Sequence, residues 1–237
     1  MAGDPGENVL AMAAKRHGPA EALPAGRGIS RELVVTRAPL HPRAEELRAL
    51  RTRILIGWAN AGVRRRALVV ASPGPGEGRS YVAANLAVAF AQLGERTLLV
   101  DADLRSPRQQ RIFGVPDGAG LAAMLAGRAG RSAQIALPEF SDLSLLPAGK
   151  QPPNPQELLL APALGALLSE LATEFGVIVF DSPPAGLYAD AQSLAFRAGS
   201  ALVLARKDRT RVSDANRTIR ELSATGARVV GTAFNAF

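Results

Sequence analysis

The sequence lacks cysteine, and it has no uncharged apolar run long enough to cross a membrane as a helix. The absence of cysteine excludes disulfide bonds and thiolate metal sites, and it fits a protein of the reducing cytosol. The N-terminus also lacks the apolar core of about 7–15 residues that a secretory signal needs. We therefore expect a cytoplasmic chain with no direct membrane insertion.

Lysine is scarce as well, since only three of the 28 basic residues are lysine and the rest are arginine. The net charge of +7 would suit an acidic partner such as nucleic acid or acidic lipid. However, the basic residues are scattered rather than gathered into a stripe, so a solvated, arginine-biased surface explains them too. Binding to nucleic acid needs a clustered basic footprint and is not expected.

The length of 237 residues indicates one domain with an appendage. Residues 1–40 are rich in glycine, proline, alanine and arginine, and they predict a flexible N-terminal tail with a short extended piece over 32–35. Residues 41–237 are predicted to form one domain that begins with a helix over 43–58. The apolar stripe of that helix is Leu47, Leu50, Ile54 and Trp58.

From residue 65 onward, predicted strands and helices alternate. The strands are expected over 66–72, 97–102, 143–146, 177–181, 201–205 and 229–234, and the helices over 80–93, 119–126, 156–174, 190–197 and 213–224. Several strands are continuously apolar, which is typical of strands covered on both faces. The alternation predicts an α/β fold with a mostly parallel sheet flanked by helices, and ligands bound at the carboxyl ends of its strands.

A glycine-rich turn connects the first of these strands to an apolar helix. The turn reads Ala71-Ser72-Pro73-Gly74-Pro75-Gly76-Glu77-Gly78-Arg79-Ser80. Small residues let backbone N–H groups converge on a phosphate, and the helix dipole adds positive potential there. The usual nucleotide loop reads G-x-x-x-x-G-K-[ST], whereas Pro73 stands here at the first glycine and Arg79 at the lysine. The turn therefore predicts a nucleotide-binding loop with an unusual cation.

Carboxylates follow two further strands, with Asp101 and Asp103 after one strand and Asp181 after the other. Parallel strands bring these ends to one sheet edge, facing a phosphate held at Ser80. Mg²⁺ takes one or two carboxylates together with phosphate oxygens, and Ser80 is placed to coordinate it directly. An alternative stays open, because a carboxylate after a strand is often a helix cap or turn former. Asp101 and Asp103 point to opposite strand faces, so one of them could be structural.

Together, the loop at 72–80, the D-x-D-x-R-x-P run at 101–107 and the D-x-P-P run at 181–184 resemble the nucleotide motifs of the bacterial tyrosine kinases. The resemblance covers roughly residues 40–237 and leans to the branch called chain-length determinant tyrosine kinases, tied to exopolysaccharide operons. The matching E-x-x-R-x-x-R oligomerisation helix is formed by Glu45, Arg48 and Arg51. The resemblance implies a P-loop NTPase fold of the ParA and MinD kind and a homo-oligomer.

The resemblance also implies ATP and Mg²⁺ as cofactors and a membrane polysaccharide co-polymerase as partner, which would hold the chain at the inner face of the plasma membrane. The expected nucleotide-binding residues are Gly74, Pro75, Gly76, Glu77, Gly78, Arg79, Ser80 and Tyr81, with Asn235 at the adenine. Ser80, Asp103 and Asp181 are expected to hold the metal. Arg79 would hold the β- and γ-phosphates, and Asp101 or Asp103 would orient the attacking tyrosine hydroxyl.

Two departures from the family pattern keep other functions open. Arg79 replaces the lysine, and no C-terminal tyrosine cluster is present, since Tyr81 and Tyr188 are the only tyrosines. Both features favour an alternative, a catalytically weak ATP-sensing regulator of the co-polymerase. A second alternative is a partition ATPase, but such loops begin K-G-G-x-G-K-T, and Gly74 stands at the first lysine of that pattern.

Overall fold

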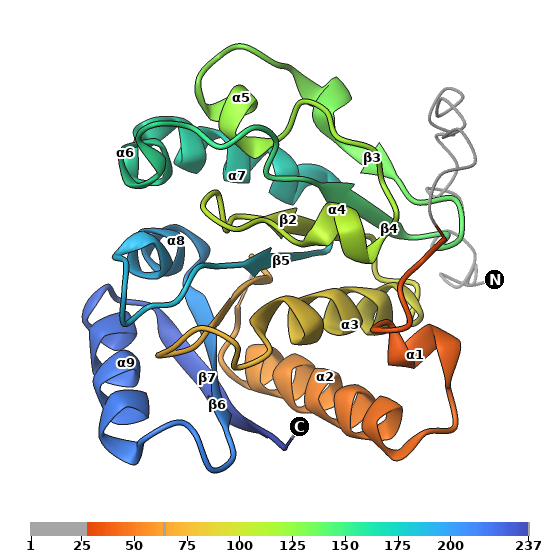
Figure 1. Ribbon diagram of the computed structural model, residues 1–237, viewed down its shortest axis with the longest axis vertical. Coiled ribbons are helices and arrows are strands. Elements are labelled where there is room, and N and C mark those ends of the chain that lie inside the picture. The colour runs from red at the N-terminus through yellow and green to blue at the C-terminus, as the bar shows by residue number, and fades with distance from the viewer. Residues whose placement is uncertain (1–27, 64, 237) are drawn as a thin grey trace, which may run out of the picture.

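The computed structural model describes residues 28–63 and 65–236. Its centre is a seven-stranded sheet in the order β3-β4-β2-β5-β1-β6-β7. Every neighbouring pair runs parallel except β3 and β4, which are antiparallel. Helices cover both faces of the sheet (Figure 1). The predicted α/β architecture with a mostly parallel sheet is therefore confirmed.

The predicted strands and helices are found within a few residues of their expected bounds. The strands are β1 (Ala67–Ala71), β2 (Thr97–Asp101), β3 (Ile135–Ala136), β4 (Leu143–Leu146), β5 (Val177–Asp181), β6 (Ser200–Arg206) and β7 (Arg228–Asn235). The helices are α1 (Val34–Arg37), α2 (Pro42–Asn60), α3 (Arg79–Ala91), α4 (Gln109–Ile112), α5 (Leu121–Leu125), α6 (Pro155–Leu160), α7 (Pro162–Glu174), α8 (Asp190–Ala198) and α9 (Val212–Ala224), with a 3-10 turn η1 (Arg131–Ala133).

One hydrophobic layer packs α2 and α3 against the sheet. The predicted stripe of α2 is confirmed, because Leu47, Ile54 and Trp58 are buried. The Trp58 ring stacks on Phe90 of α3 at a centroid distance of 5.9 Å. Its indole Nε1–H donates to the Ser200 hydroxyl at 3.1 Å, which satisfies the one polar group of this buried ring. The initial helix is thereby fixed to the rest of the domain.

The other layer consists of α5 to α9 on the opposite sheet face (Figure 1). Because both faces are covered, all residues of β1, β2 and β5 are buried. These three adjacent strands end at the same sheet edge. That edge carries the predicted site.

The segment 28–40 differs from the flexible tail predicted for it. Leu33 and Val35 are fully buried against the core layer of α3. A helical turn, α1, replaces the extended piece predicted over 32–35. Burial of these apolar side chains against α3 gives a favourable free energy that the local sequence pattern does not reveal. Tertiary packing therefore decides the conformation of this segment. Residues 1–27, the remainder of the predicted tail, lie outside the described residues.

Three further details differ from the sequence prediction. The helix predicted over 156–174 is two helices, because Ala161 is extended at ψ 149° before Pro162; a residue that precedes proline is pushed out of the helical region. The edge strand β3 and the short helix α4 were not predicted.

In the described ranges, no helix is long and apolar enough to cross a membrane.

Candidate nucleotide site

The glycine-rich turn lies between β1 and the start of α3, as predicted. Gly76 and Gly78 have φ values of 71° and 98°, a conformation that side chains with a Cβ rarely adopt. Gly78 is also the N-terminal cap of α3. The loop therefore wraps around the positive end of the α3 dipole, where an anion is stabilised.

Glu77 holds the loop in shape. Its side chain is buried, and its Oε2 accepts a hydrogen bond from the Gly74 N–H at 2.8 Å. Its Oε1 accepts a hydrogen bond from the Thr210 hydroxyl. The Glu77 carboxylate thus ties the loop to itself and to the connection between β6 and α9. In this structure the carboxylate is hydrogen-bonded to protein groups, and Glu77 is not among the residues that line the cavity.

The end of the sheet also supports the loop. Arg206, at the end of β6, donates to the Gly76 carbonyl at 3.0 Å. Asn235, at the end of β7, donates from Nδ2 to the Glu77 carbonyl at 3.2 Å. Asn235 was predicted at the adenine, and the structure places it directly beside the phosphate loop.

Arg79 lines the cavity but is anchored to the protein on three sides. Its Nε–H donates to the Ser182 carbonyl at 2.8 Å, and its NH1 donates to the Gly74 carbonyl at 2.6 Å and to the Ser72 hydroxyl. Burial lowers the pKa of Arg79, and the nearby carboxylate of Asp181 acts against this effect. The guanidinium therefore braces the loop against the end of β5.

Asp101 faces the start of α4. It is fully buried, and its Oδ2 accepts the backbone N–H groups of Arg108 at 2.9 Å and Gln109 at 2.8 Å. Burial raises the pKa of Asp101 well above its ordinary value, and the adjacent Asp181 adds to the rise. The contacts of Oδ2 suit the structural role, whereas Oδ1 is buried without a hydrogen-bond partner, so both roles predicted for Asp101 stay open.

Asp103 lines the cavity together with Arg79 and Ser80. Its Oδ1 accepts the backbone N–H groups of Arg105 at 3.2 Å and Ser106 at 2.9 Å. These two bonds fix the carboxylate at the cavity wall. Asp103 is therefore the carboxylate of the D-x-D run that a substrate in the cavity would meet.

Asp181 lies behind the loop and pairs in register with Asp101 of the neighbouring strand. It is fully buried, and its Oδ2 accepts a hydrogen bond from Gln109 Nε2 at 2.8 Å. Burial raises the pKa of Asp181 to about 6, although the hydrogen bond from Gln109 and the charge of Arg79 act in the opposite direction.

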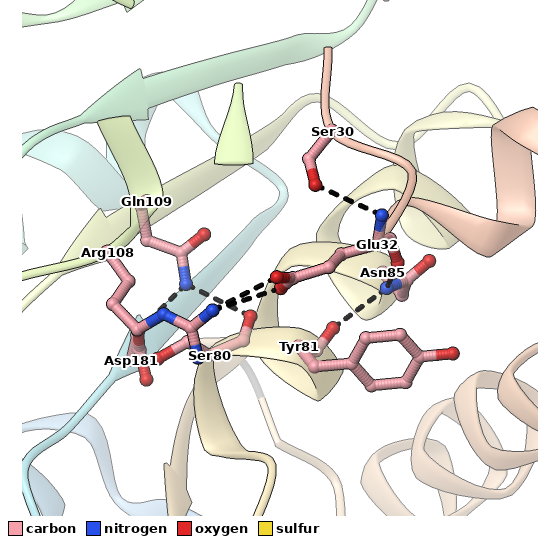
Figure 2. A network of polar contacts seen from close by, with 8 residues as sticks. All are labelled: Ser30, Glu32, Ser80, Tyr81, Asn85, Arg108, Gln109 and Asp181. Atoms are coloured by element: carbon pink, nitrogen blue, oxygen red, sulfur yellow. Dashed lines mark hydrogen bonds and ion pairs between the residues drawn. The ribbon is translucent and has the colours of Figure 1, made fainter. Parts of the chain in front are cut away.

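Gln109 links three motifs and was missed by the sequence analysis. Its Nε2 donates to Asp181 and also to the Ser80 carbonyl at 3.1 Å (Figure 2). Its backbone N–H donates to Asp101. This one fully buried residue therefore connects the loop helix to both buried carboxylates. Its place just after the D-x-D-x-R-x-P run is the only sequence signal that could have found it.

The cavity has a volume of about 370 Å³ and lies at the predicted sheet edge. Its lining residues are Pro75, Gly76, Gly78, Arg79, Ser80, Asp103, Arg105, Ser106, Arg108, Pro184, Leu187 and Tyr188. Arg105 donates to the Asp190 carboxylate at 2.9 and 3.2 Å, and its guanidinium carbon lies 4.0 Å from the centroid of the Tyr188 ring. The side chain of Tyr81, in contrast, is half-buried against the core layer of α2 and α3.

The residues fit a magnesium ion held jointly with phosphate. Within the described part of the chain, no three acidic or imidazole side chains form a ready cage. Mg²⁺ rarely needs one, because phosphate oxygens and water complete its shell around one or two carboxylates. Asp181 Oδ1 is buried and has no hydrogen-bond partner, so this oxygen is available to a cation or its water. Ser80, Asp103 and Asp181 are the residues that would hold the ion.

The predicted oligomerisation residues have partners within the chain. Arg48 forms an ion pair with Glu45 and donates to the Pro39 carbonyl at 2.8 Å. Arg51 donates to the Ala89 carbonyl of α3 at 3.0 Å. The Glu45 side chain is 65% exposed, which leaves its carboxylate accessible to a second subunit.

Comparisons with known proteins agree with this geometry. Residues 68–236 match the model of the CobQ/CobB/MinD/ParA nucleotide binding domain. A putative tyrosine-protein kinase EpsB of Ralstonia solanacearum is 35% identical over 86% of this chain, which spans only 27% of that relative. A putative tyrosine-protein kinase CapB of Staphylococcus aureus is 30% identical, with coverage of 86% of this chain and 88% of the relative.

Solved structures show the same relationship. The chimerical protein CapA2B2 superposes with a TM-score of 0.81 at 32% identity, covering 90% of this chain and 94% of that one. The kinase domain of the Escherichia coli tyrosine kinase ETK gives a TM-score of 0.82 at 25% identity, covering 93% and 82%. The cell division ATPase MinD of Pyrococcus furiosus gives 0.63 at 28% identity, covering 72% of each chain. The chain belongs to the family of bacterial tyrosine kinases, built on the nucleotide-binding fold shared with MinD and ParA.

Proposed function

We propose that the chain is an ATP- and Mg²⁺-dependent protein-tyrosine kinase that acts with a membrane polysaccharide co-polymerase in exopolysaccharide synthesis and chain-length control. The observation that carries the proposal is one cavity lined by Arg79, Ser80 and Asp103, with Asp181 buried behind the loop. Phosphoryl transfer needs these elements together: a phosphate cradle, a metal site and a carboxylate that faces the acceptor.

In the proposed reaction, the loop N–H groups and the α3 dipole bind the phosphates of ATP. Mg²⁺, when held at this site, would supply positive charge against the charge that spreads over the transferred group. Asp103 orients the acceptor tyrosine and takes its hydroxyl proton as the oxygen attacks the γ-phosphorus. The bond from that phosphorus to the bridging oxygen breaks, and ADP leaves. Ser80 and Asp181, with Asp103 directly or through water, would hold the metal, and Gln109 keeps Ser80 and Asp181 in place.

The proposed partner and location rest on the family resemblance. The chain spans about a quarter of the Ralstonia relative. We therefore also propose that it acts together with further membrane-bound segments or with a separate co-polymerase. We propose that this partner holds the chain at the inner face of the plasma membrane. We also propose a homo-oligomer formed through Glu45, Arg48 and Arg51.

A second candidate is a catalytically weak ATP sensor that regulates the co-polymerase. The specific observation in its favour is the anchoring of Arg79, which gives hydrogen bonds to Ser182, Gly74 and Ser72. A guanidinium held by these bonds stabilises the negative charge that develops on the transferred phosphoryl group less well than a mobile lysine does. The loop amides still bind ATP.

Incubation of the chain with Mg-ATP and a tyrosine-containing polymer separates these candidates. Mass spectrometry reads phosphotyrosine, and calorimetry reads nucleotide affinity. Phosphotyrosine that disappears with Asp103→Asn supports the kinase. Tight ATP binding without transfer supports the sensor. ATP hydrolysis that DNA stimulates, again without phosphotyrosine, would instead favour a partition ATPase.

A further inference from the structure

A segment before α2 crosses the two helices that flank the nucleotide site. We call residues 29–37 the strap. The Ser30 N–H donates to the carbonyl of Ile112 at the end of α4, at 2.9 Å. Leu33 and Val35 are fully buried in the layer that contains α3. The strap therefore touches both α4 and α3, and it bridges them.

A buried amide on α3 clamps the strap. Asn85 is fully buried; its Oδ1 accepts the Val35 N–H at 3.2 Å, and its Nδ2 donates to the Glu32 carbonyl at 2.9 Å. The same Nδ2 donates to the Tyr81 carbonyl at 2.9 Å, one turn back along α3. Loss of this amide would leave the buried Val35 N–H without its partner, which is costly.

A second contact joins the strap to the rim of the cavity. The Glu32 carboxylate pairs with the guanidinium of Arg108, at 3.0 and 3.3 Å (Figure 2). Arg108 lines the cavity, and its backbone N–H is held by Asp101. The next residue is Gln109, whose amide binds Ser80 and Asp181. A continuous set of contacts thus leads from Asn85 and Glu32 to the proposed metal ligands.

We propose that the strap positions the nucleotide site. When docked, it holds the start of α4 against α3 and so keeps the Gln109 amide on both Ser80 and Asp181. Asn85 and Glu32 are then positioning residues that act through Arg108 and Gln109. Because such coupling is reciprocal, bound Mg-nucleotide also tightens the strap. The inference rests on the proposed nucleotide binding, and it assigns to this segment a role in the affinity of that site.

Calorimetry with Mg-ATP tests the inference on three variants. Asn85→Ala removes the clamp and is expected to weaken nucleotide binding about tenfold, equivalent to about 1.4 kcal/mol. Glu32→Gln should weaken it about threefold, because this pair is partly exposed. Arg31→Gln, an exposed change on the same strap, is the matched control and should leave the affinity unchanged.

A double-mutant cycle shows whether the effect passes through Gln109. If it does, Asn85→Ala adds little further loss of affinity in a Gln109→Ala background. A strap that only supports the fold would instead give additive losses. Thermal unfolding of each variant identifies any that fail to fold, and Glu32→Gln at the surface serves if Asn85→Ala is one of them.

Hydrogen exchange on the unaltered chain gives an independent readout. Mg-ATP should slow the exchange of the Val35 amide several-fold, whereas the amides of α7, in the layer on the opposite face of the sheet, should not respond. Binding that is indifferent to Asn85→Ala and Glu32→Gln, with no change in strap exchange, would overturn the inference alone. A wild-type chain that binds no nucleotide would overturn the proposed function and the inference together.

Discussion

Arg79 donates its Nε–H to the Ser182 carbonyl at 2.8 Å, so the cation of the phosphate loop is attached to the residue that follows β5. A lysine ammonium is a compact charge that lacks this planar fork. Arginine at this position thus stabilises the loop through its hydrogen bonds. It also leaves the loop without the mobile cation that a lysine would offer to the phosphates. We propose that the balance between these two effects decides how active the site is.

We predict that Arg79→Lys raises the initial rate of tyrosine phosphorylation while nucleotide affinity stays within about tenfold, or ~1.4 kcal/mol. ATP binding depends mostly on loop amides, the helix dipole and Mg²⁺, whereas transfer rewards a cation that follows the developing charge. A misplaced cation costs about 10²-fold in rate. Initial rates on a tyrosine-containing substrate measure the effect, with Arg220→Lys, an exposed change on α9, as the control. A Lys variant that is equal or slower shows that Arg79 is no defect.

Asp181→Asn should stabilise the nucleotide-free chain at neutral pH. The pKa of Asp181 is raised to about 6, so the folded state holds its proton more tightly than the unfolded state does. The free energy of unfolding of the wild type therefore falls as pH rises from about 4 to 6 and Asp181 ionises. This loss of stability remains at higher pH. We expect the variant to be more stable than wild type at pH 7–8, by on the order of 1–3 kcal/mol.

The same comparison at low pH provides the check. Near pH 4 the wild-type Asp181 is protonated and resembles asparagine, so the advantage of the variant should vanish. Urea unfolding of both proteins across pH 4–8 measures this. A difference in stability that stays constant with pH would show that the titration of Asp181 contributes nothing to it.

Nucleotide binding should depend on Mg²⁺ through Ser80, Asp103 and Asp181. We expect Ser80→Ala and Asp103→Asn to lose most of the gain in affinity that Mg²⁺ gives, because the first removes an oxygen ligand and the second removes the negative charge of another. Their affinity for ATP in a chelator should match that of wild type. Calorimetry with and without Mg²⁺ measures both values, with Ser106→Ala as a hydroxyl control in the same cavity. Equal gains from Mg²⁺ in all variants contradict the proposed ligands.

The chain is predicted to self-associate through Glu45, Arg48 and Arg51. Changing all three to alanine should shift the mass in solution to that of a monomer, as read by light scattering. Because Arg51 also donates to the Ala89 carbonyl, thermal unfolding must accompany the measurement. Arg53→Ala, an exposed change on the same helix, serves as the control. A wild-type chain that is monomeric under the same conditions rules the prediction out.

The features that the sequence predicts well are those set by local pattern. The apolar runs of β1, β2 and β5 locate the strands, and the glycines of the loop require positive φ, so the sheet edge and the phosphate site follow directly. The two residues of β3 are too few to give a pattern. The strap was missed because its structure depends on burial against α3 and not on its own composition.

The side-chain roles within the site depend on partners far apart in the chain. Arg79 binds a carbonyl 103 residues away, and Gln109 binds a carboxylate 72 residues away. No spacing rule reveals such contacts. Asp101 and Asp103 illustrate the same limit, since only the fold shows that one contacts α4 and the other lines the cavity.

The pairing of Asp101 with Asp181 at the last position of β2 and β5 has a consequence for how this domain tolerates change. At the other, buried positions of these strands, we expect a substitution to harm function only by harming folding. At this last pair the relation is reversed, because two buried like charges oppose the folded state. A neutral replacement of Asp181 should therefore yield a more stable protein with a damaged metal site. A search that selects only for stability would erase the proposed site at this position first.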